Sequence, residues 1–325
     1  MYTEELDPEL QPWVELLRSP DVNDRLVAVK TLQHLGDEGA IDFLLAALQD
    51  ESPAVQKLAV TALWEFANPV AVPALIQCLA SADGDMRDEA LSALKELVAP
   101  DDLLQLLDAL QQPNMNMQLN SLILLRKIHD VQALPFILPF FESEQPALRE
   151  AAVTTLRYLN QVSCCQPAIA LLSDPDATVR RATALTLGHL NDTEVIPALC
   201  QALTTDPDWQ VRRNAAQSLA LHNAPEAIPA LGQALQDDHW QVRKFAARAL
   251  QTTADDRVLP LLVQILTDEY ADVRRDGAVA LGNLGDVSVL PALHQTLDDP
   301  DMEVRIFSQR AIQQLQASTS ATPNS

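Results

Sequence analysis

The sequence predicts an all-α protein, a right-handed α-solenoid of about ten helical hairpins with a repeat period of about 31 residues. Three observations lead to this fold class. The chain is 48% hydrophobic and only 4% aromatic, with 8 glycines in 325 residues, a composition that favours helices over strands. One arginine-centred motif recurs along the whole chain. The apolar positions around that motif follow the 3.6-residue period of a helix.

The recurring motif is Val-Arg-x-x-small, and each repeat is numbered here from its arginine, the anchor. Successive anchors are one period apart, except that the step between Arg180 and Arg212 is longer by a single residue. The ten anchors are Arg25, Gln56, Arg87, Gln118, Arg149, Arg180, Arg212, Arg243, Arg274 and Arg305. All ten repeats have a small residue at position +3 and a large aliphatic residue at position +7. Agreement in every repeat at two positions indicates true internal repetition.

Each anchor lies in a longer helix, whose apolar face consists of positions −1, +3 and +7. A shorter helix of about ten residues precedes it, as in the segment Val195–Leu199. Six of these shorter helices carry a proline in the first turn, where an amide hydrogen would have no acceptor inside the helix. These prolines are Pro73, Pro135, Pro197, Pro229, Pro260 and Pro291. Asp-Pro turns end the shorter helix, and Asp176, Asp208 and Asp301 are expected to cap the longer one.

A single hairpin cannot bury its own apolar face, so the hairpins are expected to stack into one continuous core. We expect residues 1–7 to form an N-terminal extension, residues 8–316 the solenoid, and residues 317–325 a disordered tail. The repeats are divergent in residues 8–160 and regular in residues 161–316.

Charge and hydropathy narrow the classes of partner. The 22 basic and 45 acidic side chains give a formal net charge of −23. Proteins bind nucleic acids through cationic groups, so we expect no nucleic-acid partner. The most apolar stretch, residues 133–141, is far shorter than the roughly 20 residues that cross a bilayer, so we expect no membrane insertion. The N-terminal residues lack the basic and apolar segments of a signal peptide, which makes the cytoplasm the expected location.

The pattern Asp-Pro-x-x-x-Val-Arg-x-x-Ala-x-x-x-Leu-Gly, followed by x-x-x-Ile-Pro-Ala-Leu, resembles the HEAT repeat. It is most similar to the phycobilisome-lyase-type (PBS lyase HEAT-like) variant, which includes cyanobacterial phycobilisome-degradation and bilin lyase-related proteins. The resemblance covers residues 8–316. It implies a ladder of hydrogen bonds between repeats, made by an aspartate six residues before the arginine. Five pairs stand in this register: Asp174–Arg180, Asp206–Arg212, Asp237–Arg243, Asp268–Arg274 and Asp299–Arg305. In the first half only Asp50 does, and its anchor is Gln56.

The candidate partner-binding residues lie on the longer helices, which in similar solenoids line the concave surface. Position +1 carries a cation in four successive repeats: Arg181, Arg213, Lys244 and Arg275. Trp209 and Trp240 stand at position −3, and Tyr270 is one position earlier in the next repeat. Cations interleaved with aromatic groups fit a carboxylate-bearing, partly apolar partner. The alternative is that the tryptophans pack between repeats and the cations balance nearby acids, namely Asp176, Asp208, Asp272 and Asp276.

A second candidate surface lies in the fourth repeat. Leu119 and Ile123 stand at positions +1 and +5, where polar residues are expected, and exposed apolar groups there suggest a contact surface. Phe136, Phe140 and Phe141 in the next shorter helix either extend this patch or fill the core.

The sequence lacks a Gly-rich phosphate loop, a Gly-x-Ser-x-Gly elbow, a His-Glu-x-x-His motif and a Cys-x-x-Cys motif. We therefore expect a non-enzymatic protein-binding scaffold with no cofactor. The resemblance implies that the partner is a phycobiliprotein, in phycobilisome turnover or assembly. One alternative is a bilin lyase or lyase subunit, whose cations would hold the propionates of a transiently bound bilin. The Tyr-Tyr-Ala-Ala-Trp-Trp-like segment of the lyase α subunits, however, has no counterpart in this chain. Another alternative is an iron–sulfur assembly scaffold using Cys165 and Cys200. The simpler interpretation is that the cysteines are small core residues.

Overall fold

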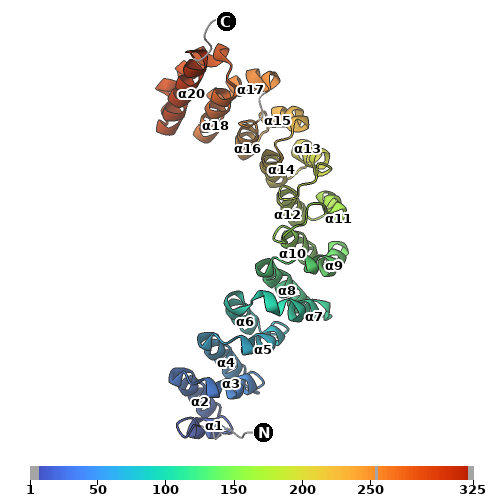
Figure 1. Cartoon of the computed structure of the whole chain (residues 1–325), viewed down its shortest axis with the longest axis vertical. Coiled ribbons are helices and arrows are strands. Elements are labelled where there is room, and N and C mark those ends of the chain that lie inside the picture. Colours follow the sequence, from blue (N-terminus) through green and yellow to red (C-terminus); the bar gives the residue numbers. More distant parts are fainter. Residues whose placement is uncertain (1–6, 253–254, 321–325) are drawn as a thin grey trace. The chain divides into compact units, whose positions relative to one another are not determined.

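The computed structural model describes residues 7–252 and 255–320, and every regular element among them is helical. The α-helices of these segments alternate between shorter and longer ones and form ten consecutive hairpins (Figure 1). The predicted all-α solenoid of stacked hairpins is therefore confirmed. The chain divides into two compact units, unit 1 with residues 1–161 and unit 2 with residues 162–325.

Unit 1 contains the first five hairpins. Its α-helices are α1 (Gln11–Leu16), α2 (Val22–Leu35), α3 (Ile41–Ala47), α4 (Pro53–Phe66), α5 (Val72–Cys78), α6 (Gly84–Leu97), α7 (Leu103–Gln111), α8 (Met115–Ile128), α9 (Leu134–Ile137) and α10 (Pro146–Leu156). Its 3-10 helices are Glu38–Ala40, Pro69–Ala71, Pro100–Asp102, Val131–Ala133 and Leu138–Glu142.

Unit 2 contains the other five hairpins. Its α-helices are α11 (Gln166–Ala170), α12 (Ala177–Leu187), α13 (Val195–Thr205), α14 (Trp209–His222), α15 (Ile228–Ala234), α16 (Trp240–Ala249), α17 (Leu259–Gln264), α18 (Ala271–Leu284), α19 (Leu290–Gln295) and α20 (Met302–Ser320). Its 3-10 helices are Leu171–Ser173, Pro225–Ala227, Asp256–Val258, Ile265–Thr267, Val287–Val289 and Thr296–Asp298. Within this unit the longer helices α12, α14, α16 and α18 pack one against the next, on the inner side of the unit's bend (Figure 1).

Side-chain caps start many of the longer helices, as predicted. Asp208 accepts hydrogen bonds from the amides of Gln210 and Val211, at 2.8 and 3.2 Å. Asp176 and Asp301 cap α12 and α20 in the same way. Each cap supplies an acceptor for amides that have none within the first helical turn. In these three helices the residue four positions before the anchor is the N-cap.

The core of both units is formed by the positions that the repeat pattern marks as apolar. All ten residues at +3 and all ten at +7 are buried. The small residues at +3 allow close approach between elements: a Cβ atom added at Gly277 would lie 2.9 Å from the side chain of Ile265. A second close approach lies further along the same helix, where a Cβ atom at Gly282 would lie 2.8 Å from that of Ala311. The two helices of one hairpin at Gly277, and two neighbouring hairpins at Gly282, are thus packed without space for larger side chains.

All ten anchors donate a hydrogen bond to the main-chain carbonyl six residues earlier, over 2.6 to 3.0 Å. The bond ties the start of each longer helix to the turn that precedes it. Glutamine replaces arginine at two anchors, and Gln56 makes the bond with its Nε2 atom at 2.6 Å. This interaction requires a donor and no charge, which explains why the anchor tolerates glutamine.

The ladder between repeats differs from the register that the resemblance implied. The anchor arginine contacts only the main chain of the aspartate in its own repeat, and its Nε and Nη2 atoms bind the carboxylate of the next repeat. In Arg212 these two atoms lie 2.7 and 2.9 Å from the carboxylate oxygens of Asp237. The same rung is formed by Arg25–Asp50, Arg180–Asp206, Arg243–Asp268 and Arg274–Asp299. Each of these carboxylates also accepts the amide two residues later and is thereby turned toward the preceding repeat. We call these five ion pairs the anchor ladder.

The end of the described chain also differs from expectation. Helix α20 runs to Ser320, so residues 317–320, which were expected to belong to a disordered tail, continue the last helix. Leu315 is fully buried and fixes the preceding turn, and adding residues to an existing helix is far easier than nucleating one. Residues 321–325 of the expected tail, and residues 1–6 of the expected extension, lie outside the described residues.

Candidate functional site

The four predicted cations lie one turn into consecutive longer helices of unit 2: Arg181 on α12, Arg213 on α14, Lys244 on α16 and Arg275 on α18. These helices pack side by side, so the cations follow one another along the inner row. We call this set the cation column. The structure therefore brings the predicted residues together, and their immediate partners determine what they can bind.

Acidic side chains of the following repeat pair with three members of the cation column. The Nε atom of Arg181 lies 3.1 Å from both carboxylate oxygens of Asp208. The Nζ atom of Lys244 lies 2.5 Å from Oδ2 of Asp272. Arg275 contacts Glu303 at 2.6 Å, and it also contacts Asp272 and Asp276.

The electrostatics of two of these pairs follow from their geometry. The hydrogen bond from Arg181 holds the pKa of Asp208 below its usual value, and the hydrogen bond from Lys244 does the same for Asp272. Both carboxylates remain charged at neutral pH and neutralise the cations beside them. Nearby acids therefore neutralise Arg181, Lys244 and Arg275, which was one of the two interpretations of the sequence.

Arg213 differs from the other three members of the column. Its Nε and Nη2 atoms donate to the amide oxygen of Asn214, at 3.1 and 2.7 Å. Its guanidinium lies over the ring of Trp209, 5.6 Å from the centroid, as the Nζ atom of Lys244 lies over Trp240 at 5.8 Å. Among the described residues no carboxylate lies within ion-pair distance of Arg213.

The two tryptophans stack on residues of the next repeat. Trp209 lies parallel to His239, with centroids 3.7 Å apart, and Trp240 lies parallel to Tyr270 at 5.0 Å. Both tryptophans are half-buried, whereas Tyr270 is 40% exposed. His239 and Tyr270 are N-cap residues that make no side-chain cap bond, which forgoes about 1 kcal/mol per helix relative to a capping residue. The stacks therefore link repeats and also form an aromatic strip beside the column.

A buried carboxylate lies beneath the column in α18. Asp276 is 5% exposed, its Oδ1 atom lies 3.1 Å from Nε of Arg275, and its Oδ2 atom has no hydrogen-bond partner among the described residues. Burial raises the pKa of Asp276. The equivalent residue two repeats earlier is Asn214, whose Nδ2 atom donates to the main-chain oxygen of Arg181 at 2.9 Å. The repeat pattern gives this position no separate role.

The predicted apolar patch in unit 1 is only partly exposed. Leu119 and Ile123 are half-buried on α8. Phe136 is 37% exposed, whereas Phe141 is 5% exposed and belongs to the core. The core-filling alternative therefore holds for Phe141.

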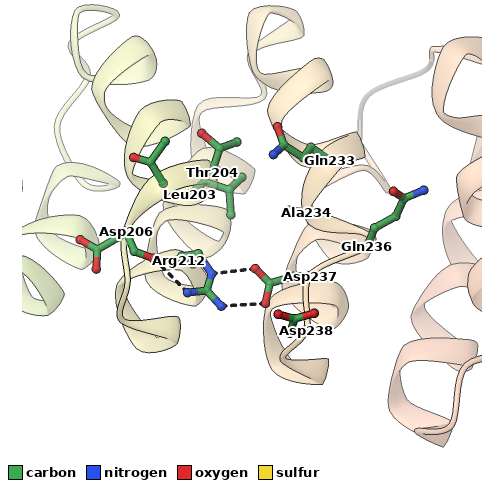
Figure 2. Close-up of a pocket in the computed structure, with 10 residues that line it drawn as sticks. Leu203, Thr204, Asp206, Arg212, Gln233, Ala234, Gln236, Asp237 and Asp238 are labelled. Carbon is green, nitrogen blue, oxygen red and sulfur yellow. Dashed lines mark hydrogen bonds and ion pairs between the residues drawn. The ribbon is translucent and has the colours of Figure 1, made fainter.

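The anchor ladder lines the polar clefts of unit 2. One has a volume of about 410 Å³. In it Arg212 joins the main chain of Asp206 to the carboxylate of Asp237 (Figure 2). A cleft of about 630 Å³ lies one repeat further on and is lined by Asp237, Arg243 and Asp268. In these clefts Arg212 binds Asp237 and Arg243 binds Asp268, so the clefts follow from the stacking of the repeats.

The cysteines lie in environments that favour the neutral thiol. Cys78 and Cys165 are buried, Cys200 is half-buried and Cys164 is exposed. Burial raises the pKa of Cys78 to about 11 and also raises that of Cys165 and Cys200, which disfavours the thiolate required of a metal ligand or nucleophile. Across residues 7–252 and 255–320, no group of three or more His, Cys, Asp or Glu side chains is placed to hold a metal ion. No helix in these segments is long and apolar enough to span a bilayer.

The repeat geometry, the small residues at +3 and the anchor ladder together define an α-solenoid of stacked two-helix repeats. A family model described as HEAT repeats matches residues 10–95, 141–219, 196–281 and 262–323. These segments include more than half of the chain, which therefore belongs to the HEAT-repeat family. No curated protein sequence matches the chain.

Solved structures share the fold. An engineered protein is 22% identical, with a TM-score of 0.54 over 95% of this chain and 99% of its own. The Escherichia coli protein YibA is 21% identical, with a TM-score of 0.51 over 92% of this chain and 98% of its own. Kap95p, whose binding induces the switch loops of RanGDP to adopt the GTP-bound conformation, is 15% identical with a TM-score of 0.63. That match includes 96% of this chain and 51% of the Kap95p chain. At these identities the likeness concerns the fold.

Proposed function

We propose that the protein is a non-enzymatic scaffold that binds a protein partner through the inner face of unit 2. The observation that carries this proposal is the arrangement of the cation column beside the stacked aromatic residues on consecutive helices. Interfaces between proteins are enriched in arginine, tryptophan and tyrosine, because these side chains combine large contact area with directional polar groups. Extended repeat surfaces of this kind present many such groups to one ligand.

The fold likeness to Kap95p supports this class of function, because Kap95p binds another protein, RanGDP. The proposed binding residues are the cation column, Arg181, Arg213, Lys244 and Arg275, together with Trp209 and Trp240. Leu119 and Ile123 in unit 1 form a second, smaller contact surface in this proposal.

A phycobiliprotein is the partner that we propose, acting in phycobilisome turnover or assembly. The support is the similarity of the repeat motif to the phycobilisome-lyase-type HEAT repeat. Such a partner carries its own bilins, so a scaffold need only hold it, and no cofactor of its own is required.

A direct binding experiment tests this proposal. The protein and a purified phycobiliprotein are mixed, and complex formation is measured by sedimentation velocity with detection at the visible absorption of the bilin. Hydroxyl-radical footprinting then compares the free and bound protein. We expect protection of Trp209, Trp240 and Tyr270 in unit 2, while Trp13 and Trp64 in unit 1 serve as internal controls. Absence of a complex, or protection confined to other residues, contradicts the proposal.

The same mixture separates the scaffold from its alternatives. A lyase would attach free phycocyanobilin covalently to a cysteine of the apo-phycobiliprotein, and the pigment would remain on the client after denaturation and electrophoresis. A scaffold would leave the bilin unattached. Purified protein with a brown colour and a broad visible absorption band would instead support the iron–sulfur alternative.

A further inference from the structure

Two members of the cation column belong to a second ladder with its own spacing along the chain. Lys244 pairs with Asp272, and Arg275 pairs with Glu303, and in each case the acid stands 28 residues after the cation. The same spacing joins Lys57 to Asp85 in unit 1, at 3.1 Å. In these three repeats the cation at position +1 is met by an acid at position −2 of the next repeat, whereas Arg181 is met by Asp208 at position −4.

This second ladder is interrupted at Arg213. The residue at the corresponding position of the next repeat is Gln241, which carries no charge, and the N-cap position nearby is occupied by His239 where the preceding repeat has Asp208. Arg213 uses Nε and Nη2 to bind Asn214, so its Nη1 edge makes no hydrogen bond within the described segments. Within the described segments, this leaves one arginine of the column without an ion pair.

The surroundings of Arg213 supply a flat apolar wall. Trp209 lies beneath the guanidinium, and the parallel ring of His239 stacks on it. All three side chains are half-buried, so they are held in place and still reach solvent. A guanidinium whose orientation is fixed by an aromatic ring is prepared to bind a carboxylate at little entropic cost.

We infer that Arg213, Trp209 and His239 form a binding site for an acidic segment of the partner protein, in which an aspartate or glutamate follows or precedes an aromatic residue. The inference rests on the proposed scaffold function and identifies the point where the partner is anchored. The partner's carboxylate takes the place that Asp272 and Glu303 occupy one and two repeats later. Its aromatic neighbour packs against the strip formed by Trp209 and His239.

Two short peptides test the inference. The probes are acetyl-Gly-Phe-Glu-Phe-Gly-amide and its counterpart with glutamine in place of glutamate. Binding is followed by NMR through the indole N–H signal of Trp209 and the Nε–H signal of Arg213, since this method detects millimolar affinities. We expect the glutamate peptide to shift both signals and the glutamine peptide to bind at least tenfold more weakly.

Two variants assign the binding to Arg213. Arg213→Gln removes the charge and is expected to weaken binding of the glutamate peptide at least tenfold. Gln241→Glu restores the missing acid from within the chain, so it is expected to weaken binding to the same extent while leaving the thermal unfolding temperature unchanged or raised. Within residues 7–252 and 255–320 the side chain of Gln241 makes no hydrogen bond that this change would break.

A matched control is available at the same position. Gln241→Asn changes the side chain without adding a charge. It is expected to bind the glutamate peptide as the unmodified protein does.

Several results would overturn the inference. These are equal binding of the two peptides, unchanged binding by Gln241→Glu, or equal losses in Gln241→Glu and Gln241→Asn. Shifts of the same two signals by phycocyanobilin but not by the glutamate peptide would assign the site to the carboxylates of a bilin. If Gln241→Glu retains full affinity for a phycobiliprotein, the inference that Arg213 anchors the partner is wrong, although the proposed scaffold function remains valid. If the peptide results are as expected and no phycobiliprotein binds, the proposed partner fails and the acidic-segment site stands.

Discussion

The anchor ladder can be tested at its last rung, Arg274–Asp299. The guanidinium Nε and Nη2 atoms lie 2.7 and 2.8 Å from the two carboxylate oxygens, and the side chains are only 12% and 7% exposed. Asp299→Asn preserves the shape and one acceptor oxygen but removes the charge and the second acceptor. Hydrogen bonds to charged groups contribute about 1.5–3 kcal/mol. The limited exposure of this pair supports the middle of that range, about 2 kcal/mol.

The loss should be local, because a repeat in a solenoid is coupled only to its neighbours. The rung joins α18 to the turn before α20, so the variant should lower the free energy of opening of the last hairpin. Native-state hydrogen exchange, read by mass spectrometry on peptides from α20, measures this opening directly. A loss of about 2 kcal/mol corresponds to roughly 30-fold faster exchange when about 1.4 kcal/mol is tenfold.

The effect of Asp299→Asn should also depend on pH, in a direction that follows from the pKa of Asp299. The hydrogen bond from Arg274 holds the pKa of Asp299 below its ordinary value of 3.8. The contribution of this carboxylate to stability is therefore fully present above the ordinary value and is lost as the pH falls through the lowered native pKa. The difference in exchange between the unmodified protein and Asp299→Asn should be constant at neutral pH and should shrink in acid.

An exposed pair provides the control. The carboxylate of Asp85, which pairs with Lys57, is 84% exposed, and such surface pairs contribute about 0–1 kcal/mol. Asp85→Asn should therefore accelerate exchange of its own hairpin by no more than about fivefold. Equal effects of the two substitutions, or an Asp299→Asn effect that persists unchanged in acid, would refute the reasoning about the anchor ladder.

Two further predictions concern buried positions in α18. Asp276→Asn should raise the unfolding midpoint in urea at pH 7 by an amount equivalent to about 1 kcal/mol, because the new amide can donate as that of Asn214 does. Burial raises the pKa of Asp276, so in acid the folded unmodified protein protonates this carboxyl and no longer buries a charge. The extra stability of Asp276→Asn over the unmodified protein should therefore decrease as the pH falls. An increase in acid would contradict this explanation. Gly282→Ala should lower the melting temperature, at a cost of about 1–3 kcal/mol, because the added methyl group would lie 2.8 Å from Ala311. In Gly232→Ala the nearest contact is 3.4 Å, so that control should be neutral or stabilising, and equal effects of the two would contradict close packing as the cause.

The sequence predicts the repeats well because their determinants are local or periodic. A cap, a proline and a small residue act within one hairpin, so their spacing is enough to place them. Spacing alone does not predict which residues pair in the anchor ladder. The main-chain oxygen of Asp237 accepts a hydrogen bond from Arg243, whereas its carboxylate binds Arg212 of the preceding repeat. The direction of that carboxylate depends on the turn and on the offset between stacked hairpins, neither of which is visible in the spacing alone.

The sequence predicts which residues form the candidate site, but not which of its cations pair with acids. The sequence places cations at successive +1 positions, yet their partners are acids of the following repeat, near the start of the next longer helix. The separation between cation and acid has meaning only after the stacking offset is known. Once that offset is known, the sequence shows that Arg213 faces no acid at these positions, because Gln241 stands at −2 and His239 at −4 of the next repeat. Asp276 was overlooked as a buried group for the same reason, because its burial arises from contact between repeats.

Two adjacent arginines on α14 have different roles: Arg212 stabilises the stacking of repeats, and Arg213 is the residue inferred to bind the partner. Arg212 belongs to the anchor ladder and binds Asp237 in a largely buried pair, whereas Arg213 belongs to the more exposed second ladder. Rungs of the second ladder resemble surface ion pairs, which contribute about 0–1 kcal/mol. Omitting one rung at Arg213 therefore costs the solenoid little, because the Arg212 rung still couples the same two repeats. The chain can expose one oriented guanidinium at this point and keep the coupling that holds its hairpins together.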